Sequence, residues 1–390
     1  MKNIKIGILG AALNNGNLGV NALGFCLVNV VSESAKKYNK NAKIVFFSTD
    51  NKEDIYSYVN DMGIYKFDIC TPISIKKFKV LKEFKNKISE CDLVIDVTGG
   101  DSFSDIYGNN RCIRETIGKF IAEKYSTIVL APQTIGPFKT KFNKWLARRA
   151  MDKAGIVFAR DKMSYDYAKS IVKKAEIKLT SDLAFDLPYD NQKIVSSDKI
   201  KIGLNINALM WNGGYNCNNQ FELKTDYINY VYSVVEGLNK KENVEIHLIS
   251  HVVHKLEVEN DYLICREIKD KYPDCILVEP FSTPMQAKTY IKDMDVFIGG
   301  RMHSTIAASS TNVAVIPVSY SRKFEGLYNT LGYDHLINCR DLDTETAISK
   351  TFELIDNRKT MSEKIANSSN LAKERLSVFY DYLDEMISKI

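Results

Sequence analysis

Short runs of β-branched and apolar residues alternate with longer amphipathic segments along the whole chain, and this pattern constrains the fold most. In the first half, such runs cover Ile4–Leu9, Lys43–Phe47, Leu93–Val97, Thr127–Ala131 and Ile156–Phe158. A second series covers Lys201–Asn207, Val244–Ile249, Cys275–Val278, Val296–Ile298 and Val313–Val318. Strands that alternate with helices form parallel sheets. The sequence therefore predicts an α/β protein with two Rossmann-like parallel-sheet domains.

A stretch of turn-forming residues between Asp186 and Asp198 separates the two series. A chain of 390 residues is too long for one ordinary core, so a boundary is expected there. We predict an N-terminal Rossmann-like domain over residues 1–190, a C-terminal one over residues 198–359, and a helical tail over residues 360–390.

Composition excludes several classes of protein. The formal charge of +5 is spread along the chain without a polybasic block, which argues against nucleic acid as a partner. The eight cysteines contain no CxxC pair, which predicts free thiols and a reducing cytoplasm. No window offers the ~20 apolar residues that a membrane span needs. Peripheral contact with the inner face of a membrane stays open.

Two glycine pairs follow apolar strands at equivalent places in the two halves. Gly99-Gly100 and Gly299-Gly300 each stand where a strand meets a helix. In open α/β sheets ligands bind beyond the carboxyl ends of the strands. We therefore expect the two domains to face a cleft that holds the functional site.

The strongest local signal is the run Gly299-Gly300-Arg301-Met302-His303-Ser304. Glycine allows close backbone approach, a helix start offers N–H donors to an anion, and Arg301 can bind a carboxylate or phosphate through two hydrogen bonds. His303 could donate or accept a proton. The plainer alternative is that Arg301 pairs with a surface acid and His303 caps the helix.

Other candidates each have a structural alternative. Arg160 is a second anion ligand, or else it pairs with Asp161 while Asp161 caps the next helix. Lys323 contacts a phosphate or is a solvated lysine at a helix start. Asp101 holds sugar hydroxyls or acts as a base, or it supplies loop and cap hydrogen bonds.

Three residues of the second half are further candidates for ligand contact. His251 and His254 have the i, i+3 spacing of half a metal site, but no ligand set completes it, so we predict no metal and leave contact with a ligand open. Trp211 either stacks on a sugar or covers the core.

An ordered set of motifs resembles the polysaccharide pyruvyl transferase family. The signature is Gly300-Arg301-Met302-His303 with the later run Tyr320–Leu327. Upstream motifs agree in order: Gly16-Asn17-Leu18-Gly19, Gly99–Asp105, Gln133–Phe138, Ala159–Ser164 and Ser181–Phe185. The likeness runs from about residue 14 to about residue 333, and it is the ordered set that is specific. A Lys- and Asn-rich composition is also typical of bacterial proteins.

This resemblance implies transfer of a pyruvyl group from phosphoenolpyruvate to two hydroxyls of a saccharide, with a cyclic ketal and phosphate as products, in cell-surface polysaccharide biosynthesis. It also implies a glycosyltransferase-B-like fold and phosphoenolpyruvate as co-substrate, with no other cofactor. The expected catalytic residues are His303, Arg301 and Asp101. The expected donor-binding residues are Arg301, Arg160, Gly300, Ser304 and Lys323. The expected residues for the acceptor, a saccharide that a lipid could carry, are Asn17, Asp101, Ser102, Gln133, Trp211, His251 and His254.

The chain departs from the family pattern in two places. Val20-Asn21 stands where an acid often follows the early loop, and Asp101 replaces the third glycine of a Gly-Gly-Gly loop. Two other functions therefore stay open. A nucleotide-sugar glycosyltransferase of the same architecture would need a carboxylate for the ribose, for which Glu325 or Glu279 is available. A non-catalytic saccharide-binding protein is the third alternative.

Overall fold

The computed structural model describes residues 2–48, 67–74, 77–105, 108–192 and 198–390. It forms two compact units. Unit 1 consists of residues 1–15, 20–183 and 372–390, and unit 2 of residues 16–19 and 184–371. The last part of the expected linker, residues 193–197, lies outside the described residues.

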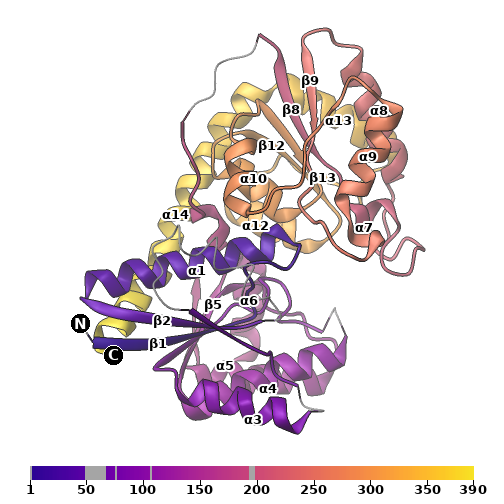
Figure 1. Ribbon diagram of the computed structural model, residues 1–390. Coiled ribbons are helices and arrows are strands. Elements are labelled where there is room, and N and C mark those ends of the chain that lie inside the picture. The colour runs from indigo at the N-terminus through magenta and orange to yellow at the C-terminus, as the bar shows by residue number, and fades with distance from the viewer. Residues whose placement is uncertain (1, 49–66, 75–76, 106–107, 193–197) are drawn as a thin grey trace. The chain divides into compact units, whose positions relative to one another are not determined.

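Unit 1 is built on a parallel sheet of seven strands in the order β3-β2-β1-β4-β5-β6-β7 (Figure 1). The strands are β1 (Lys2–Leu9), β2 (Lys40–Phe47), β3 (Phe67–Cys70), β4 (Leu93–Asp96), β5 (Thr127–Gln133), β6 (Ile156–Ala159) and β7 (Glu176–Leu179). The helices are α1 (Leu18–Lys37), α3 (Phe78–Ser89), α4 (Asn109–Tyr125), α5 (Lys141–Ala154) and α6 (Lys162–Ile171), with a 3₁₀ turn η1 (Leu183–Asp186) at the boundary.

Helices α3, α4 and α5 cover one face of this sheet, where the apolar side chains of strands and helices form a continuous core. Phe47 of β2 and Phe84 of α3 meet edge to face there, with ring centroids 5.0 Å apart. The C-terminal part of α14 packs on the sheet as well, because Phe379 lies 5.1 Å from Phe158 of β6. Both chain ends therefore belong to unit 1, and they lie next to each other in Figure 1.

Unit 2 is built on a parallel sheet of six strands in the order β10-β9-β8-β11-β12-β13. The strands are β8 (Ile200–Asn205), β9 (Val244–Leu248), β10 (Ile276–Leu277), β11 (Val296–Gly299), β12 (Ala314–Ser319) and β13 (Ile337–Asn338). The helices are α7 (Ala208–Trp211), α8 (Tyr227–Asn239), α9 (Asp261–Lys271), α10 (Pro284–Ile291), α11 (Met302–Ser309), α12 (Arg322–Thr330), α13 (Thr344–Asp356) and α14 (Arg358–Lys389), with a 3₁₀ turn η2 (Glu257–Glu259).

The predicted α/β architecture with two parallel sheets is confirmed, and every strand expected from the sequence forms. Three short strands, β3, β7 and β13, were not among those expected. The units differ from the expected domains in two respects. Residues 16–19 belong to unit 2, and the tail is not separate, because α14 runs from unit 2 into unit 1.

The first helix corrects one expectation. Leu18–Lys37 is long and apolar enough to cross a membrane by length and composition, with a mean hydropathy of 1.3, although no such window was expected. In the fold, 72% of that window is buried inside the protein, as in a core helix.

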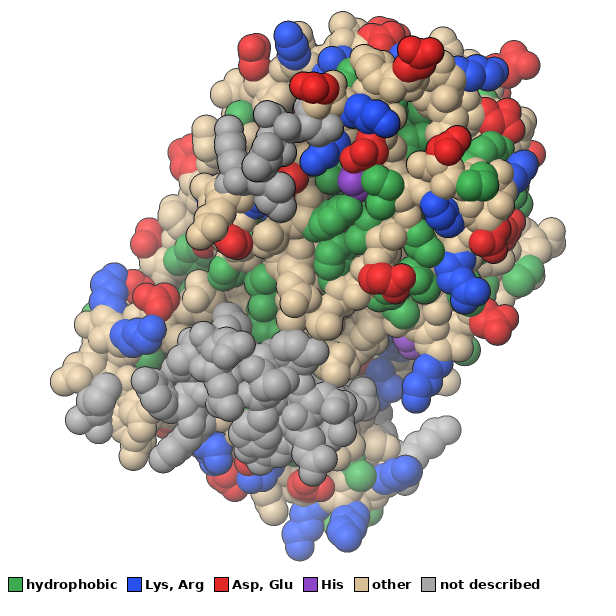
Figure 2. Space-filling view, turned by 45° about the horizontal axis from the view of Figure 1, so that its top comes forward, with side chains coloured by type: hydrophobic (Ala, Val, Ile, Leu, Met, Phe, Trp, Pro, Cys, Tyr) green, Lys and Arg blue, Asp and Glu red, His purple; other side chains and the backbone are tan. Residues whose placement is uncertain are grey.

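All eight cysteines are free thiols, as predicted. Charge is also distributed as the sequence suggests: Figure 2 shows a face of the molecule on which basic and acidic side chains are interspersed.

Candidate active site

The candidate site in unit 2 lies where the strand order reverses. β8 and β11 are neighbours in the sheet, but the chain leaves them for opposite edges, and this is the point at which α/β sheets bind ligands. Asn205 ends β8, and Gly300-Arg301 follows β11. The Asn205 amide joins the loops: its Nδ2 donates to the carbonyl of Ile249 at 2.9 Å, and its Oδ1 accepts from the Arg301 N–H and the Ser304 hydroxyl, both at 3.0 Å.

Gly300 is required by close packing between these loops. A Cβ on Gly300 would lie 2.8 Å from the Cβ of Asn207, which is too close for any larger residue. Asn207 in turn donates from Nδ2 to the Gly300 carbonyl at 2.8 Å. The glycine pair therefore lets β8 and β11 end side by side and brings Arg301 to the switch point.

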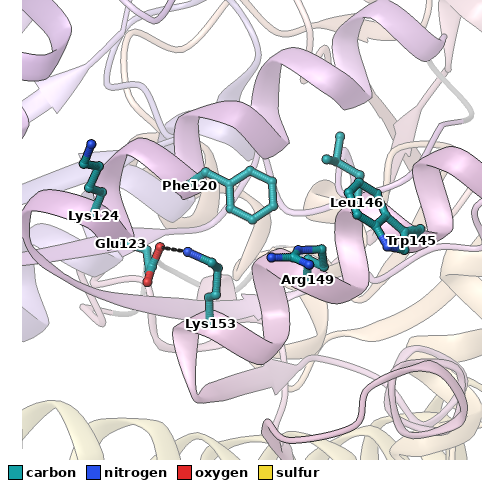
Figure 3. A pocket seen from close by; sticks show the side chains of 7 residues that line it. All are labelled: Phe120, Glu123, Lys124, Trp145, Leu146, Arg149 and Lys153. Carbon is teal, nitrogen blue, oxygen red and sulfur yellow. Dashed lines mark hydrogen bonds and ion pairs between the residues drawn. The ribbon is translucent and has the colours of Figure 1, made fainter.

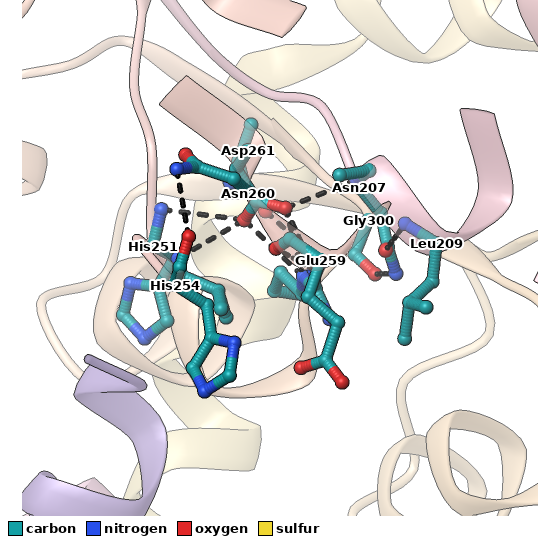
Figure 4. A network of polar contacts seen from close by, with 12 residues as sticks. Asn207, Leu209, His251, His254, Glu259, Asn260, Asp261 and Gly300 are labelled. Atoms are coloured by element: carbon teal, nitrogen blue, oxygen red, sulfur yellow. Dashed lines mark hydrogen bonds and ion pairs between the residues drawn. The ribbon is translucent and has the colours of Figure 1, made fainter. Parts of the chain in front are cut away.

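The guanidinium of Arg301 is held by a buried carboxylate, that of Asp261 at the start of α9. Figure 4 shows Asp261 and Glu259 within this network of polar contacts. Arg301 Nη2 donates to Asp261 Oδ1 at 2.7 Å and to the Glu259 carbonyl at 3.0 Å, and Nε contacts both carboxylate oxygens at 3.1 and 3.2 Å. Nη1 takes no part in these bonds. Burial alone would lower the pKa of Arg301, but the ion pair with Asp261 raises it above the ordinary value.

Asp261 also organises the surrounding backbone. Its Oδ1 accepts the N–H of Ala208 at 3.0 Å, and its Oδ2 accepts the N–H of Val252 at 3.1 Å and of His251 at 3.4 Å. One carboxylate with no solvent exposure thus ties together α7, the loop after β9, and Arg301. Sequence reasoning missed this residue.

His251 is a buried histidine beside the arginine. Only 3% of it is exposed, and neither ring nitrogen has a hydrogen-bond partner in the part of the chain that the structure describes. Burial, together with the nearby charges of His303 and Arg301, lowers its pKa to about 3. The imidazole is therefore neutral near pH 7 and offers one donor and one acceptor.

The early loop packs against His303. Asn17 pairs with Val252 in an isolated bridge, and its Oδ1 accepts the Gly19 N–H at 3.0 Å, which caps α1. A Cβ at Gly19 would overlap the imidazole of His303. The fold therefore brings Asn17, His251 and His303 together within unit 2, and His303 does not cap α11, whose N-cap is Arg301.

Three other predicted residues of unit 2 lie around this centre. The Ser304 hydroxyl lies within hydrogen-bond distance of two acceptors, the Arg301 carbonyl at 2.7 Å and Asn205 Oδ1 at 3.0 Å, which share its single proton. Lys323 follows the adjacent strand β12, half-buried, with its Nζ 5.4 Å from the ring centre of Tyr320. His254 makes local bonds, since its Nδ1 accepts the Leu256 N–H at 3.1 Å.

Trp211 lies at the end of α7 and is 9% exposed. Its ring packs edge to face on Tyr232, with centroids 5.5 Å apart. Trp211 therefore covers the core, which was one of the two roles expected for it.

The predicted residues of unit 1 lie at the equivalent edge of its sheet, after β4, β5 and β6. Asp101 and Ser102 follow β4, and the Ser102 hydroxyl accepts from Arg111 Nη2 at 2.9 Å. Gln133 ends β5 fully buried, with Nε2 donating to the carbonyls of Asp96 and Ala131 at 3.0 and 3.1 Å. Its Oε1 has no partner among the residues described.

Arg160 ends up in an ion pair, but not the one expected. It is fully buried, and Nη1 lies 2.6 Å from the carboxylate of Asp182, which is equally buried. Asp161 caps α6 by accepting the Ser164 N–H at 2.8 Å, as the alternative proposed. Arg160 belongs to unit 1 and Arg301 to unit 2.

A buried polar cluster beneath the first glycine pair was also missed. Lys119 of α4 lies 2.9 Å from the Asp96 carboxylate and 2.6 Å from the Thr98 hydroxyl, and both charged side chains are about fully buried. Burial raises the pKa of Asp96, and Lys119 opposes that shift. Thr98 has φ +42°, and Gly99 and Gly100 also have positive φ. A β-branched residue in this region is strained, as is common near functional sites.

Two further features lie apart from these loops. Within the described ranges, no group of three His, Cys, Asp or Glu side chains could hold a metal ion. A shallow groove of about 800 Å³ lies on the outer surface of α4 and α5 in unit 1 (Figure 3). Its lining residues are Phe120, Glu123, Lys124, Trp145, Leu146, Arg149 and Lys153.

Comparison with known proteins gives a family and a fold. Residues 17–322 match the model of a family described as polysaccharide pyruvyl transferase. A search of curated proteins finds no match.

Among solved structures, a putative UDP-N-acetylglucosamine 2-epimerase from Listeria monocytogenes has a TM-score of 0.64 at 13% identity, covering 98% of this chain and 97% of that one. MnaA from S. aureus with UDP has a TM-score of 0.58 at 15% identity, and the match covers 98% of both chains. HepE from Anabaena with UDP-glucose has 0.58 at 12% identity, covering 99% of this chain and all of that one. These likenesses establish the glycosyltransferase-B-like fold.

Proposed function

The chain belongs to the polysaccharide pyruvyl transferase family, and from this premise we propose that it moves a pyruvyl group from phosphoenolpyruvate to two hydroxyls of a saccharide. The products are a cyclic pyruvate ketal and inorganic phosphate. The saccharide is a precursor of a cell-surface polysaccharide, and the reaction takes place in the cytoplasm.

One observation carries the proposal: Arg301, held rigidly by Asp261, stands with His303 in the Gly-Gly turn at the switch point of unit 2. Phosphoenolpyruvate carries a carboxylate and a phosphate. The N-terminal N–H groups of α11 and the Arg301 guanidinium suit such an anion, because both are preorganised donors. Since Nε and Nη2 are engaged by Asp261 and Glu259, Nη1 is the donor proposed to contact the ligand.

Lys323 is the proposed second cation of the donor site. It follows β12, the strand next to β11, so its chain position is at the same edge of the sheet as Arg301. A lysine ammonium binds phosphate as a point charge, whereas arginine favours a planar carboxylate or phosphate face. We propose that Lys323 contacts the phosphate and Arg301 the carboxylate.

His303 is the proposed acid and base. It gives a proton to the methylene carbon of the donor, which leaves an oxocarbenium-like C2, and a first sugar hydroxyl bonds to C2 and loses its proton to the imidazole. The second hydroxyl then bonds to C2 as the C–O bond to phosphate breaks, and its proton leaves with the phosphate. Two hydroxyl protons thus become one methyl hydrogen and one phosphate proton, and the histidine is regenerated.

The neutral His251 supports this assignment. A charged imidazole at His251 would repel the Arg301 guanidinium and would disfavour the protonated form of His303. Because burial keeps His251 neutral, it can hydrogen-bond to a sugar hydroxyl or to the donor without changing the charge of the site. We propose this role for His251, with Asn17 as its neighbour on the early loop.

The acceptor assignments in unit 1 remain part of the proposal. Asp101 and Ser102 follow the strained turn at Thr98, and Gln133 carries the buried Oε1 without a partner. These groups are of the kind that hold sugar hydroxyls. The Arg160 side chain is fully buried in an ion pair with Asp182. We therefore propose that Arg160 holds the loop after β6 in place and does not itself contact the anion.

The nucleotide-sugar alternative has less support. The Glu325 carboxylate accepts a hydrogen bond from Asn338 Nδ2 at 2.6 Å, and that of Glu279 accepts one from the Tyr262 hydroxyl at 3.0 Å. Both candidate ribose ligands therefore already have partners on the chain.

Ligand-induced thermal stabilisation separates the two functions. We expect phosphoenolpyruvate to raise the melting temperature of the full chain, because a ligand of the native state stabilises by mass action. UDP-glucose and UDP-N-acetylglucosamine should have no effect. Arg301→Lys keeps the charge but loses the paired donors, so the shift should shrink in that variant. Stabilisation by the UDP-sugars alone would reverse the assignment.

A further inference from the structure

The exposed side of α5 carries aromatic and basic residues together, and we name it the α5 face. Its core consists of Phe142 and Trp145, which are 55% and 45% exposed, and of the exposed cations Lys141, Lys144 and Arg149. The two rings stack with centroids 6.1 Å apart, and the Arg149 guanidinium lies 5.4 Å from the Trp145 ring centre. Large exposed aromatics gathered in one place usually mark a binding surface.

The end of α4 extends this face. Tyr125 is 41% exposed, and Lys124 lies over its ring at 5.4 Å. The groove of about 800 Å³ runs between the two helices, and Figure 3 shows the side chains of Trp145, Arg149 and Lys153 along it. The opposite side of α5, with Ala147, Ala150 and Met151, is buried.

The α5 face has a net positive charge. Lys153 pairs with Glu123 at 2.7 Å, but Lys141, Lys144 and Arg149 form no ion pair within the described part of the chain. The one acid of the helix, Asp152, accepts the backbone N–H groups of residues 173–175, and these bonds lower its pKa although burial opposes them. Asp152 keeps its negative charge, but it is a single acid on α5 against the cations Lys141, Lys144 and Arg149.

We propose that the α5 face docks on the surface of an anionic phospholipid bilayer. Tryptophan and other aromatic rings favour the membrane–water interface, and each nearby Lys or Arg is attracted to acidic headgroups. Stable attachment to a membrane generally takes two signals, and this face offers an aromatic and an electrostatic one. Two exposed aromatics, with three cations on the same helix that form no ion pair among the described residues, match the polarity and charge of that interface.

A second copy of the chain fits this face less well. A two-fold contact would place the same patch on both partners, so the cations Lys141, Lys144 and Arg149 of one copy would face the same cationic patch of the other. Like charges brought together in this way are repelled. An anionic lipid surface removes that repulsion.

The test uses the full chain with phosphatidylcholine vesicles, with and without 30% phosphatidylglycerol (about this fraction gives a strong surface charge). The chain has only two tryptophans, and Trp211 is buried while Trp145 is exposed. We expect co-sedimentation with the anionic vesicles only, weakening as salt is added. Trp145 emission should shift to the blue and become protected from iodide.

Matched variants locate the surface. Lys141→Glu/Lys144→Glu/Arg149→Glu should weaken vesicle partitioning by at least about a hundredfold, because three attractive charges of about 1 kcal/mol each become repulsive. The control Lys240→Glu/Lys255→Glu/Lys359→Glu removes the same charge from exposed lysines of unit 2 and should bind as the wild type does. Trp145→Phe should keep binding and lose the spectral shift. If the first triple variant does not fold, the salt dependence of binding and the loss of the spectral shift in Trp145→Phe still test whether this face contacts the vesicles.

Several results would overturn the proposal. These are no binding to anionic vesicles, equal loss in both triple variants, or binding without a change in Trp145 emission. A dimer in the absence of lipid that the α5 variant dissociates would identify the face as a subunit contact instead.

Discussion

Replacing Asp261 by Asn tests whether one buried carboxylate holds the candidate site together. The change leaves Arg301 as a buried charge without its partner, since the Arg301 side chain is 11% exposed and Asp261 is not exposed at all. Removing one member of a buried pair costs about 3–5 kcal/mol. The new amide NH₂ would also face the N–H of either Ala208 or Val252, two donors that the carboxylate now accepts. Asn therefore cannot restore the bonds.

The assay can report on unit 2 alone. In a Trp145→Phe background, Trp211 is the only tryptophan, and it lies on α7, whose first N–H is bonded to Asp261. Thermal unfolding followed by Trp211 fluorescence should show a melting temperature lowered by on the order of 10 °C. Phosphoenolpyruvate affinity should fall as well, because Arg301 is no longer held in place.

The matched control is Glu222→Gln. It removes an acid from an ion pair with Arg340 at 3.2 Å in the same unit, but these side chains are 81% and 46% exposed. Exposed pairs contribute about 0–1 kcal/mol, so the melting temperature should barely change. If Asp261→Asn were no more destabilising than this control, the buried pair would not organise the site as argued.

Three further predictions follow from the buried groups. The pKa of His251 is about 3 in the folded state and ~6.5 in the unfolded state, so the free energy of unfolding falls as the pH drops below ~6.5. Urea unfolding should show a loss of about 2 kcal/mol between pH 7 and pH 5. The variant His251→Gln should not show this loss. Gly19→Ala should displace the imidazole of His303 and reduce phosphate release on the order of a hundredfold. Lys119→Met should leave Asp96 without its partner and lower the free energy of unfolding by about 3–5 kcal/mol.

Each of these has an outcome that contradicts it. An identical pH dependence in His251→Gln would mean that other histidines cause the loss. The control for Gly19→Ala is Gly118→Ala in α4. A Cβ on Gly118 would have its nearest neighbour at 3.6 Å, which is an ordinary contact. Equal activity in the two glycine variants would show that Gly19 does not set the position of His303. An unchanged free energy of unfolding in Lys119→Met would show that the buried cluster under Thr98 tolerates Asp96 without its partner.

The sheets could be predicted from the sequence because each strand is a compact apolar run. The three strands that escaped prediction are short or have weaker patterns. β13 has two residues, β3 (Phe67–Cys70) has four, and β7 (Glu176–Leu179) has charged residues at alternate positions. The strand ends were also predictable, since Gly299-Gly300 marks the turn that brings Arg301 to the switch point.

The partners of the site arginines could not be predicted. Asp261 follows Asn260 at a helix start, where an acid commonly serves as a cap, and it lies 40 residues from Arg301 in sequence. Arg160 was weighed against its neighbour Asp161, but its partner is Asp182, 22 residues away. Such pairs depend on which strand ends are adjacent, and strand order is set by the tertiary fold.

Turnover of phosphoenolpyruvate in the presence of saccharide acceptors tests the central claim most directly. Phosphate release should depend on an acceptor with two suitably placed hydroxyls, and the acceptor should gain a carboxyethylidene group, seen by mass and by the carbon resonance of the ketal. His303→Asn should bind phosphoenolpyruvate as the wild type does but release phosphate at least a hundredfold more slowly. Equal release by wild type and His303→Asn, or an acceptor that gains a sugar from a UDP-sugar instead, would contradict the account.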